Sequence, residues 1–354
     1  GWVPTVGIVA GRCFAGNANL LGMCDVIIAT QGANVGMAGP AMIEGAGLGK
    51  FTPEDVGPVQ VQATNGVIDV VVDDEAAAVA TAKLYLSFFS RCSHGDPSAP
   101  PGGQQLDLRT IVPHNRKRSY DMRRVVDIVA DAGSVLQLRS AFGQTMITCL
   151  AKIGGHAVGV IANQPLVMAG TIDSDGADKA ARFIQLCDAH DIPIVFFCDT
   201  PGIMVGPEAE RSALVRHTGR LLVTLGETTV PFVTVITRKS YGLGGLMMGN
   251  KGCDPVAVVG WPSAELGAMG IEGAVNLGFK DQLAAAESEE ERSHLFNSLV
   301  EEAYNQGRGL ASAARFEIDD IIDPADTRSY LCRLLDALPT PPPRKTKKHA
   351  VDTW

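Results

Sequence analysis

The chain has 354 residues, of which 46% are hydrophobic and 19% are charged, a balance that excludes wholesale disorder. Its formal net charge of −9 and aromatic content of 6% argue against a nucleic-acid partner, which needs a basic surface or stacking rings. No apolar run reaches the roughly 20 residues that span a bilayer, and no leader-like segment opens the sequence. The eight cysteines contain no Cys-x-x-Cys pair, so we expect no metal site and a cytoplasmic location.

The first predicted element is a buried strand over residues 3–10 (VPTVGIVA). A domain seldom begins at a core strand, so we expect further residues upstream of the first one. Residues 192–198 (IPIVFFC) form a continuous apolar run, which is typical of a central strand buried on both faces. Apolar residues at helical spacing precede it over 180–187 and follow it over 214–225, and 232–236 is again a strand. This alternation predicts an α/β fold with a mainly parallel sheet.

One segment that cannot hold regular structure divides the chain. Residues 94–103 (HGDPSAPPGG) are rich in proline and glycine, which predicts a linker. We therefore expect a first domain over 1–90, a linker over 91–119 and a second domain over 120–338. Residues 339–354 combine prolines with the basic run RKTKK and are expected to form a solvated tail.

An internal repeat links the two predicted domains. Residues 3–14 (VPTVGIVAGRCF) resemble residues 230–241 (VPFVTVITRKSY), at an offset of about 227 to 231 residues. Each copy continues into a glycine-rich turn, a helix start rich in leucine and methionine, a Cys-Asp pair and a second apolar strand. The shared order of these features predicts a duplicated fold.

A strand that breaks at glycines and enters a helix leaves backbone N–H groups without partners beyond the strand end. Two such donors on one oxygen stabilise a developing oxyanion, by about 3 kcal/mol per donor in well-studied cases. The alternative is that the glycines only permit tight strand–helix packing; the duplication favours the functional interpretation. A phosphate loop is excluded because residues 45–50 (GAGLGK) lack its spacing, and a dinucleotide fingerprint is excluded at 242–245 (GLGG).

The first turn, residues 11–25 (GRCFAGNANLLGMCD), resembles the crotonase superfamily of coenzyme A enzymes. Its hydratases carry a catalytic glutamate where this chain has Asn19, and an amide cannot accept a proton at neutral pH, so hydration is not expected. Further blocks narrow the resemblance to the carboxyltransferase component of biotin-dependent acyl-CoA carboxylases (acetyl-/propionyl-CoA carboxylase beta type). These blocks are residues 159–165, 178–184, 192–202, 237–242, 261–265 and 318–328.

This resemblance implies two crotonase-like (ClpP/crotonase) ββα-superhelix domains, the first incomplete because its N-terminal half would lie upstream. It also implies that one pair of backbone N–H groups holds the thioester oxygen of acyl-CoA, at Ala15 and Gly16. A second pair would hold the ureido oxygen of biotin, at Leu243 and Gly244. The internal repeat instead places the second pair one residue earlier, at Gly242 and Leu243.

The turns depart from the family pattern. Residues 15–17 read AGN where relatives show GGA, and residues 241–245 read YGLGG where they commonly show YGGAY. Backbone donors survive such changes, whereas the shape of the pocket does not. Leu246 occupies a position that helps to set acyl specificity in short-chain relatives, and its apolar side chain indicates a different acyl group.

The other candidate residues for binding substrate or biotin surround the second turn. Gly242 opens the turn, and Pro201 and Gly202 follow the central strand. Arg238 ends the strand that leads into the turn, beside Lys239; for both basic residues, functional and structural roles stay open.

Four further positions have structural alternatives. His217 is expected to be a hydrogen-bonded structural histidine, and Asp199 is expected to cap a turn. Lys179 and Arg182 share a helix face, which either meets an anionic ligand or is solvated.

The family's reaction needs no side-chain base. Carboxybiotin releases carbon dioxide, its ureido enolate removes the α-proton of the thioester, and the thioester enolate captures the carbon dioxide in a pocket that excludes water. Both partners carry a negative oxygen, so two facing oxyanion holes are required. Biotin would be carried by a partner or by another region of the same polypeptide, and would not be attached covalently here.

The partners that the resemblance implies are acyl-CoA, a biotin carboxyl carrier, a biotin carboxylase and further copies of the chain, from a dimer to a hexamer, with sites between protomers. Two alternatives stay open. One is the subunit of a biotin-dependent decarboxylase that feeds a membrane sodium pump; the other is a non-catalytic scaffold fragment.

Overall fold

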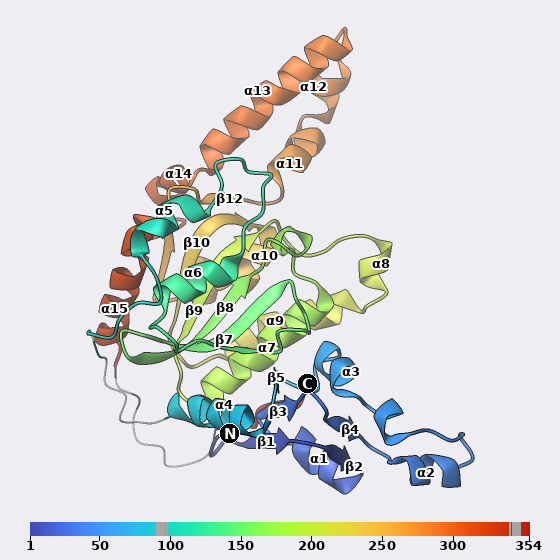
Figure 1. Cartoon of the computed structure of the whole chain (residues 1–354). Coiled ribbons are helices and arrows are strands. Elements are labelled where there is room, and N and C mark those ends of the chain that lie inside the picture. Colours follow the sequence, from blue (N-terminus) through green and yellow to red (C-terminus); the bar gives the residue numbers. More distant parts are fainter. Residues whose placement is uncertain (90–95, 97, 340, 342–347) are drawn as a thin grey trace.

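Two sheet regions organise the chain, a small one near the N-terminus and a large one built from strands between residues 136 and 321 (Figure 1). The computed structural model describes residues 1–89, 96, 98–339, 341 and 348–354. In the small region, parallel strands lie in the order β1 (Val6–Val9), β3 (Val26–Thr30) and β5 (Val70–Val72), and β2 (Arg12–Phe14) pairs with β4 (Asn34–Gly36). Among the described residues, no helix has the length and apolar character to cross a membrane.

The large sheet has eight strands, in the order β13-β11-β10-β9-β8-β7-β6, with β12 paired to β10. The pairs β6·β7 and β7·β8 are antiparallel and the rest are parallel. This confirms an α/β class with a mixed sheet. The strands are β6 (Leu136–Leu138), β7 (Met146–Ile153), β8 (His156–Asn163), β9 (Ile194–Thr200), β10 (Phe232–Tyr241), β11 (Ala257–Gly260), β12 (Glu265–Gly267) and β13 (Asp320–Ile321).

Helices cover both faces of the large sheet and extend from the molecule at two ends (Figure 1). The helices are α1 (Gly16–Gly22), α2 (Pro40–Gly45), α3 (Val59–Thr64), α4 (Glu75–Ser87), α5 (Leu108–Ile111), α6 (Met122–Val129), α7 (Ser174–Ala189), α8 (Pro207–Glu210), α9 (Leu214–Glu227), α10 (Gly242–Met247), α11 (Ile271–Gly278), α12 (Lys280–Ala284), α13 (Glu289–Gly307), α14 (Gly309–Ala314) and α15 (Thr327–Ala337).

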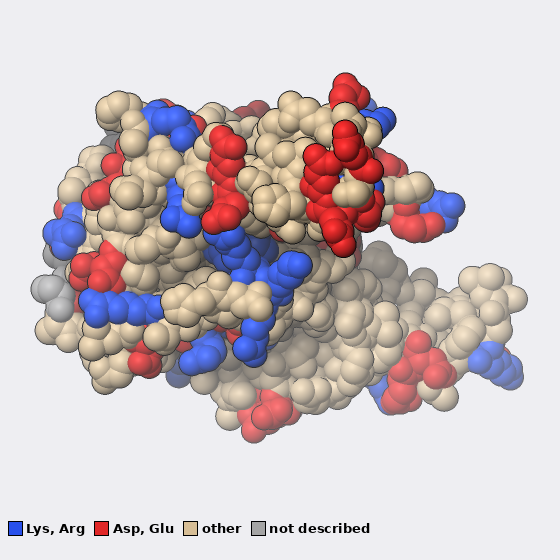
Figure 2. All heavy atoms as spheres, turned by 90° about the horizontal axis from the view of Figure 1, so that it is seen from above, with Lys and Arg blue, Asp and Glu red and all other residues tan. Residues whose placement is uncertain are grey.

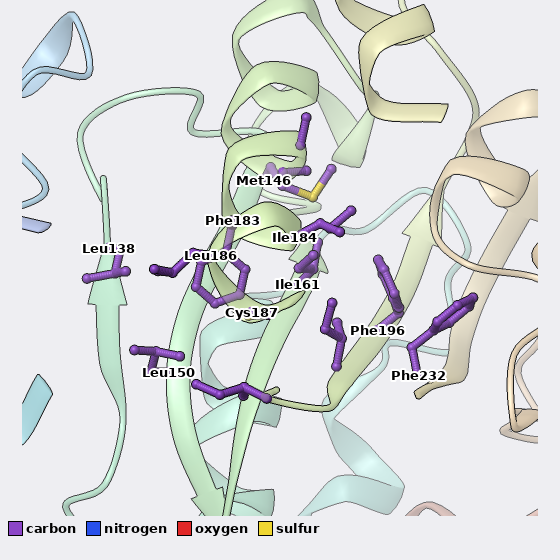
Figure 3. Close-up of a cluster of buried hydrophobic side chains, with 14 of the residues drawn as sticks. Leu138, Met146, Leu150, Ile161, Phe183, Ile184, Leu186, Cys187, Phe196 and Phe232 are labelled. Atoms are coloured by element: carbon purple, nitrogen blue, oxygen red, sulfur yellow. The ribbon is translucent and has the colours of Figure 1, made fainter. Parts of the chain in front are cut away.

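The predicted central strand is β9, whose seven residues are all buried. It lies between β8 and β10. On one face α7 packs Phe183 and Cys187 toward the strands, as Figure 3 shows. On the other face α6 and α15 form a second hydrophobic cluster with the sheet. A strand buried on both faces explains why the apolar run is continuous rather than alternating.

The strand predicted over residues 3–10 is shorter and less buried than expected. It is β1, an edge strand that pairs only with β3 among the described residues. Its burial alternates, and Ile8 is 44% exposed. A Cβ on Gly7 would come within 2.4 Å of the Leu21 side chain, so glycine lets α1 pack closely on the covered face.

The internal repeat is confirmed by the register of the strands. Val6 pairs with Val26 in the first copy, and Val233 pairs with Ala257 in the second. The same two offsets relate the pairing of β2 with β4 to that of β10 with β12. Sequence similarity and strand pairing therefore identify the same duplicated unit.

The duplication extends to one hydrogen bond that sequence comparison did not reveal. The carboxylate of Asp69 accepts from the backbone N–H of Ile27 at 2.8 Å. The carboxylate of Asp319 accepts from Val258 N–H, also at 2.8 Å. Each aspartate precedes the third strand of its copy, β5 or β13, so the two copies include these strands.

The two sheet regions share one core and a buried polar junction. Tyr85, on α4, belongs to the same hydrophobic cluster as the strands of the large sheet. The Arg139 guanidinium contacts Asp69 at 3.1 Å, and Arg182 donates to the carbonyl of Asp25 at 2.8 Å. Burial lowers the pKa of Arg139 to about 10. These contacts join residues of the small region to residues of the large one.

Part of the predicted linker and tail is ordered. Residues 98–119 include α5, whereas 91–95 and 97 lie outside the described residues. Residues 348–354 contain no buried residue, in agreement with a solvated tail, but they contact the folded chain: Lys348 Nζ lies 2.7 Å from Asp191, and His349 Nε2 lies 2.8 Å from Asp188. Carboxylates near the end of α7 attract the basic residues of this segment; residues 342–347 lie outside the described ones.

Candidate functional site

The first turn joins β2 to α1 through a strained alanine. Ala15 has φ 56° and ψ −130°, a conformation that a side chain disfavours and glycine tolerates. Its backbone N–H donates to the carbonyl of Gly36 at 3.1 Å, so this predicted donor is already occupied. The N–H groups of Gly16 and Asn17 open α1, where a helix offers them no acceptor, and neither donates to a loop carbonyl or side chain among the described residues.

The second turn joins β10 to α10 in the same way. Gly242 has φ 54° and corresponds to Ala15 in the register of the repeat. The N–H groups of Leu243 and Gly244 follow in the first turn of α10, and neither donates to a loop carbonyl or side chain in the part of the chain that the structure describes. The structural repeat therefore matches Gly16 and Asn17 with Leu243 and Gly244.

The loop after β9 lies directly against this second turn at Gly202. A Cβ on Gly244 would come within 2.6 Å of the Gly202 Cα. Only residues without a side chain allow these two backbones to approach so closely. Leu246 is half-buried, and its side chain lies against Gly252.

Arg238 is placed beside the second turn, but its guanidinium is buried and held by the protein. Its Nε lies 3.0 Å from Asp199, its Nη1 donates to the carbonyl of Arg118 at 2.9 Å, and it lies over the ring of Tyr120. The expectation that Asp199 caps a turn is wrong, because its carboxylate pairs with Arg238 and accepts from Lys239 N–H. The turn cap is the Thr200 hydroxyl, which accepts from Gly202 N–H.

The remaining titratable candidates have structural roles. His217 Nδ1 lies 2.6 Å from the Asp178 carboxylate, as expected for a structural histidine. Lys179 is buried, and its Nζ donates to the carbonyl of Phe142 at 2.8 Å; burial lowers its pKa to about 7. The expectation of a solvated or ligand-binding face for Lys179 and Arg182 is wrong, because both are buried in contacts with backbone carbonyls.

A polar network behind the second turn was missed from the sequence. The hydroxyl of Tyr241 donates to Glu265 at 2.9 Å, and Arg116 Nε contacts the other oxygen of that carboxylate at 2.7 Å. Arg116 also lies 3.7 Å from the centre of the Tyr304 ring. The internal repeat was the sequence feature that could have indicated this network, because Glu265 on β12 is equivalent to Asn34 on β4 in the duplicated unit.

The two turns lie far apart within one chain. Figure 1 shows α1 beside the small sheet and α10 on the large one, with α7 and α9 between them. Both turns carry exposed apolar side chains: Leu20 on α1 and Met23 directly after it, and Leu243, which is 57% exposed, on α10. Each turn places two backbone N–H groups at a helix start; Gly16 and Asn17 are exposed in the first turn, whereas in the second Leu243 is exposed and Gly244 is buried.

Comparison with known proteins identifies relatives along the whole chain. Residues 1–351 match the family Carboxyl transferase domain. The methylmalonyl-CoA carboxyltransferase 12S subunit of Propionibacterium freudenreichii subsp. shermanii is 35% identical, with 99% of this chain and 67% of that subunit covered. The biotin-dependent long chain acyl-coenzyme A carboxylase beta4 subunit of Mycobacterium tuberculosis is 36% identical, with coverage of 96% and 66%. The chain thus spans about two thirds of these relatives.

Solved structures show the same similarity. A single-chain, multi-domain long-chain acyl-CoA carboxylase superposes with a TM-score of 0.85 at 46% identity, covering 94% of this chain and 32% of that one. The transcarboxylase 12S structure superposes with a TM-score of 0.86 at 34% identity, covering 98% and 68%. Fold and relatives together define a carboxyltransferase. The chain belongs to the Carboxyl transferase domain family, and its relatives include carboxyltransferase subunits of biotin-dependent acyl-CoA carboxylases.

Proposed function

We propose that the chain transfers a carboxyl group from carboxybiotin to the α-carbon of an acyl-CoA, with one backbone oxyanion site for each substrate. The observation that carries this proposal is the pair of register-matched turns. Gly16 and Asn17 would hold the thioester oxygen, and Leu243 and Gly244 would hold the ureido oxygen of biotin. Ala15 is left out as a donor because its N–H is bonded to Gly36; its role is to shape the turn.

The chemistry follows from what the two turns stabilise. Carboxybiotin, when bound, supplies both the carboxyl group and the base. Donors at the first turn stabilise the thioester enolate, and donors at the second turn stabilise the ureido anion, each by about 3 kcal/mol per N–H. The exposed Leu20, Met23 and Leu243 would exclude water from the site once they are covered.

The duplicated fold supports two crotonase-like domains, residues 1–90 on the acyl-CoA side and 120–338 on the biotin side. Because α1 and α10 lie apart in one chain (Figure 1), the site would form between the first turn of one copy and the second turn of another. The transcarboxylase 12S structure is a hexamer assembly with methylmalonyl-coenzyme A bound, which supports a homo-oligomer and an acyl-CoA substrate here.

Membership of this family also supports partner proteins that carry biotin and carboxylate it. Its members are described as biotin-dependent, and one relative holds all its domains in a single chain. We therefore extend the proposal to a biotin carboxyl carrier and a biotin carboxylase, on separate proteins or on the same polypeptide.

The test is a proline substitution that deletes one donor. Leu243→Pro removes the N–H in the first helical turn, where proline is tolerated, whereas Leu243→Ala keeps the N–H and removes the side chain. We expect the full-length protein to transfer labelled carboxyl from carboxybiotin in an acyl-CoA-dependent way. Leu243→Pro should lower the rate by about 100-fold or more, and Leu243→Ala far less. No transfer with any acyl-CoA would favour a scaffold; equal rates for the two variants would exclude the oxyanion role.

A further inference from the structure

A cleft of about 720 Å³ opens at the carboxyl edge of the large sheet, apart from the two donor turns. Its volume lies within the range of about 300–1,000 Å³ that small-molecule sites occupy. The cleft lies between the segment around α5, the segment after β11, and the segment after β13. Apolar side chains, Val112, Pro262 and Ile321 among them, form part of its wall.

The polar part of the wall is basic. Four arginines line the cleft, against two carboxylates. Two of these arginines are engaged: Arg109 forms a two-pronged contact with Asp323 at 2.7–3.0 Å, and Arg238 is held by its own buried partner. Arg308 is exposed and has no ion pair or side-chain hydrogen bond to another described residue. Figure 2, the view from above, shows that lysine and arginine side chains gather near the middle of this face.

Arg116 is the second basic group available to a ligand. Its Nε is bound to Glu265 at 2.7 Å, and 42% of its side chain is exposed. A guanidinium has five N–H donors, so its terminal nitrogens can bind an anion while Nε keeps its contact. Glu265 also accepts from Tyr241, which directly precedes the second turn. The cleft is therefore connected to that turn through one carboxylate.

We propose that this cleft binds a small organic oxyanion, a phosphate or carboxylate head on an apolar body. Arg308 and the terminal nitrogens of Arg116 bind the head, and the apolar wall packs against the body. Arginine suits this role because its planar fork matches the oxygens of both head groups. The site is separate from the donor turns, and its occupation does not require biotin or acyl-CoA.

The test measures binding to the full chain by isothermal titration calorimetry, with phenyl phosphate and benzoate as probes and phenol as the neutral control. We expect at least one of the anions to bind, inorganic phosphate to bind more weakly than phenyl phosphate, and phenol not to bind. Arg308→Gln should weaken anion binding by about tenfold or more, the effect of losing one charge-assisted contact. Arg333→Gln, which changes an exposed arginine on α15 away from the cleft, should leave it unchanged.

A third variant tests the role of Arg116. Glu265→Gln removes the negative charge beside Arg116, so anion binding should tighten, provided that circular dichroism shows an unchanged fold. The proposal is overturned if no anion binds at millimolar concentration, if phenol binds as well as phenyl phosphate, or if Arg308→Gln binds like the unsubstituted protein. Because binding is measured without turnover, the result stands whether or not carboxyl transfer is observed.

Discussion

Ala15 should be a site where removing a methyl group stabilises the protein. Its backbone is held at φ 56° and ψ −130°, which costs a residue with a Cβ about 1–3 kcal/mol. Glycine adopts this conformation without strain, but loses about 0.5–1 kcal/mol more conformational entropy on folding. The difference predicts that Ala15→Gly raises the free energy of unfolding by about 1 kcal/mol.

The matched control is Ala18→Gly, the same change in the middle of α1, where the side chain is buried. There glycine should destabilise by about 1 kcal/mol, because the helix loses its best former. Urea unfolding followed by circular dichroism, at one fixed protein concentration, measures both variants. If Ala15→Gly lowers the unfolding midpoint as Ala18→Gly does, the strain assigned to the first turn is refuted.

Two further predictions concern buried charges. Burial lowers the pKa of Lys179 from 10.5 to about 7. Between pH 7 and 10.5 the unfolded chain therefore binds more protons than the folded chain. The free energy of unfolding should rise with pH across this window, by up to about 1.4 kcal/mol per pH unit. Lys179→Met should flatten this rise in urea midpoints measured at pH 7 and 9, and an unchanged slope would contradict the assignment. Breaking the buried Arg238–Asp199 pair with Arg238→Met should cost about 3–5 kcal/mol. Replacing both partners, with Asp199→Leu added, should cost less, and a larger loss in the double variant would contradict this account.

Local pattern predicted much of the fold. The continuous apolar run at 192–198 identified β9, and the helical spacing on either side identified α7 and α9. The repeat also predicted the matching strands, because a duplicated unit preserves its order of turns and pairs. The resemblance predicts donors at Ala15–Gly16 and Leu243–Gly244, whereas the strand register matches Gly16–Asn17 with Leu243–Gly244.

Long-range contacts decided the rest. The Ala15 N–H donates to the carbonyl of Gly36. Residue spacing in the sequence does not indicate that Gly36 lies beside the turn. Lys179 and Arg182 follow the pattern of an exposed helix face, yet both side chains are buried. They donate hydrogen bonds to the carbonyls of Phe142 and Asp25. In each case the partner is distant in sequence, so propensity and periodicity carried no information about it.

The most direct test of the central claim mixes two inactive variants. Asn17→Pro removes a donor from the first turn, and Leu243→Pro removes one from the second. If each site joins the first turn of one copy to the second turn of another, dissociating and reassembling an equal mixture gives hybrid pairs in which one site keeps both turns intact. Carboxyl transfer should then return to about a quarter of the unsubstituted rate for a two-fold pair. No recovery, in a mixture shown to form hybrids, would contradict a site built from two copies.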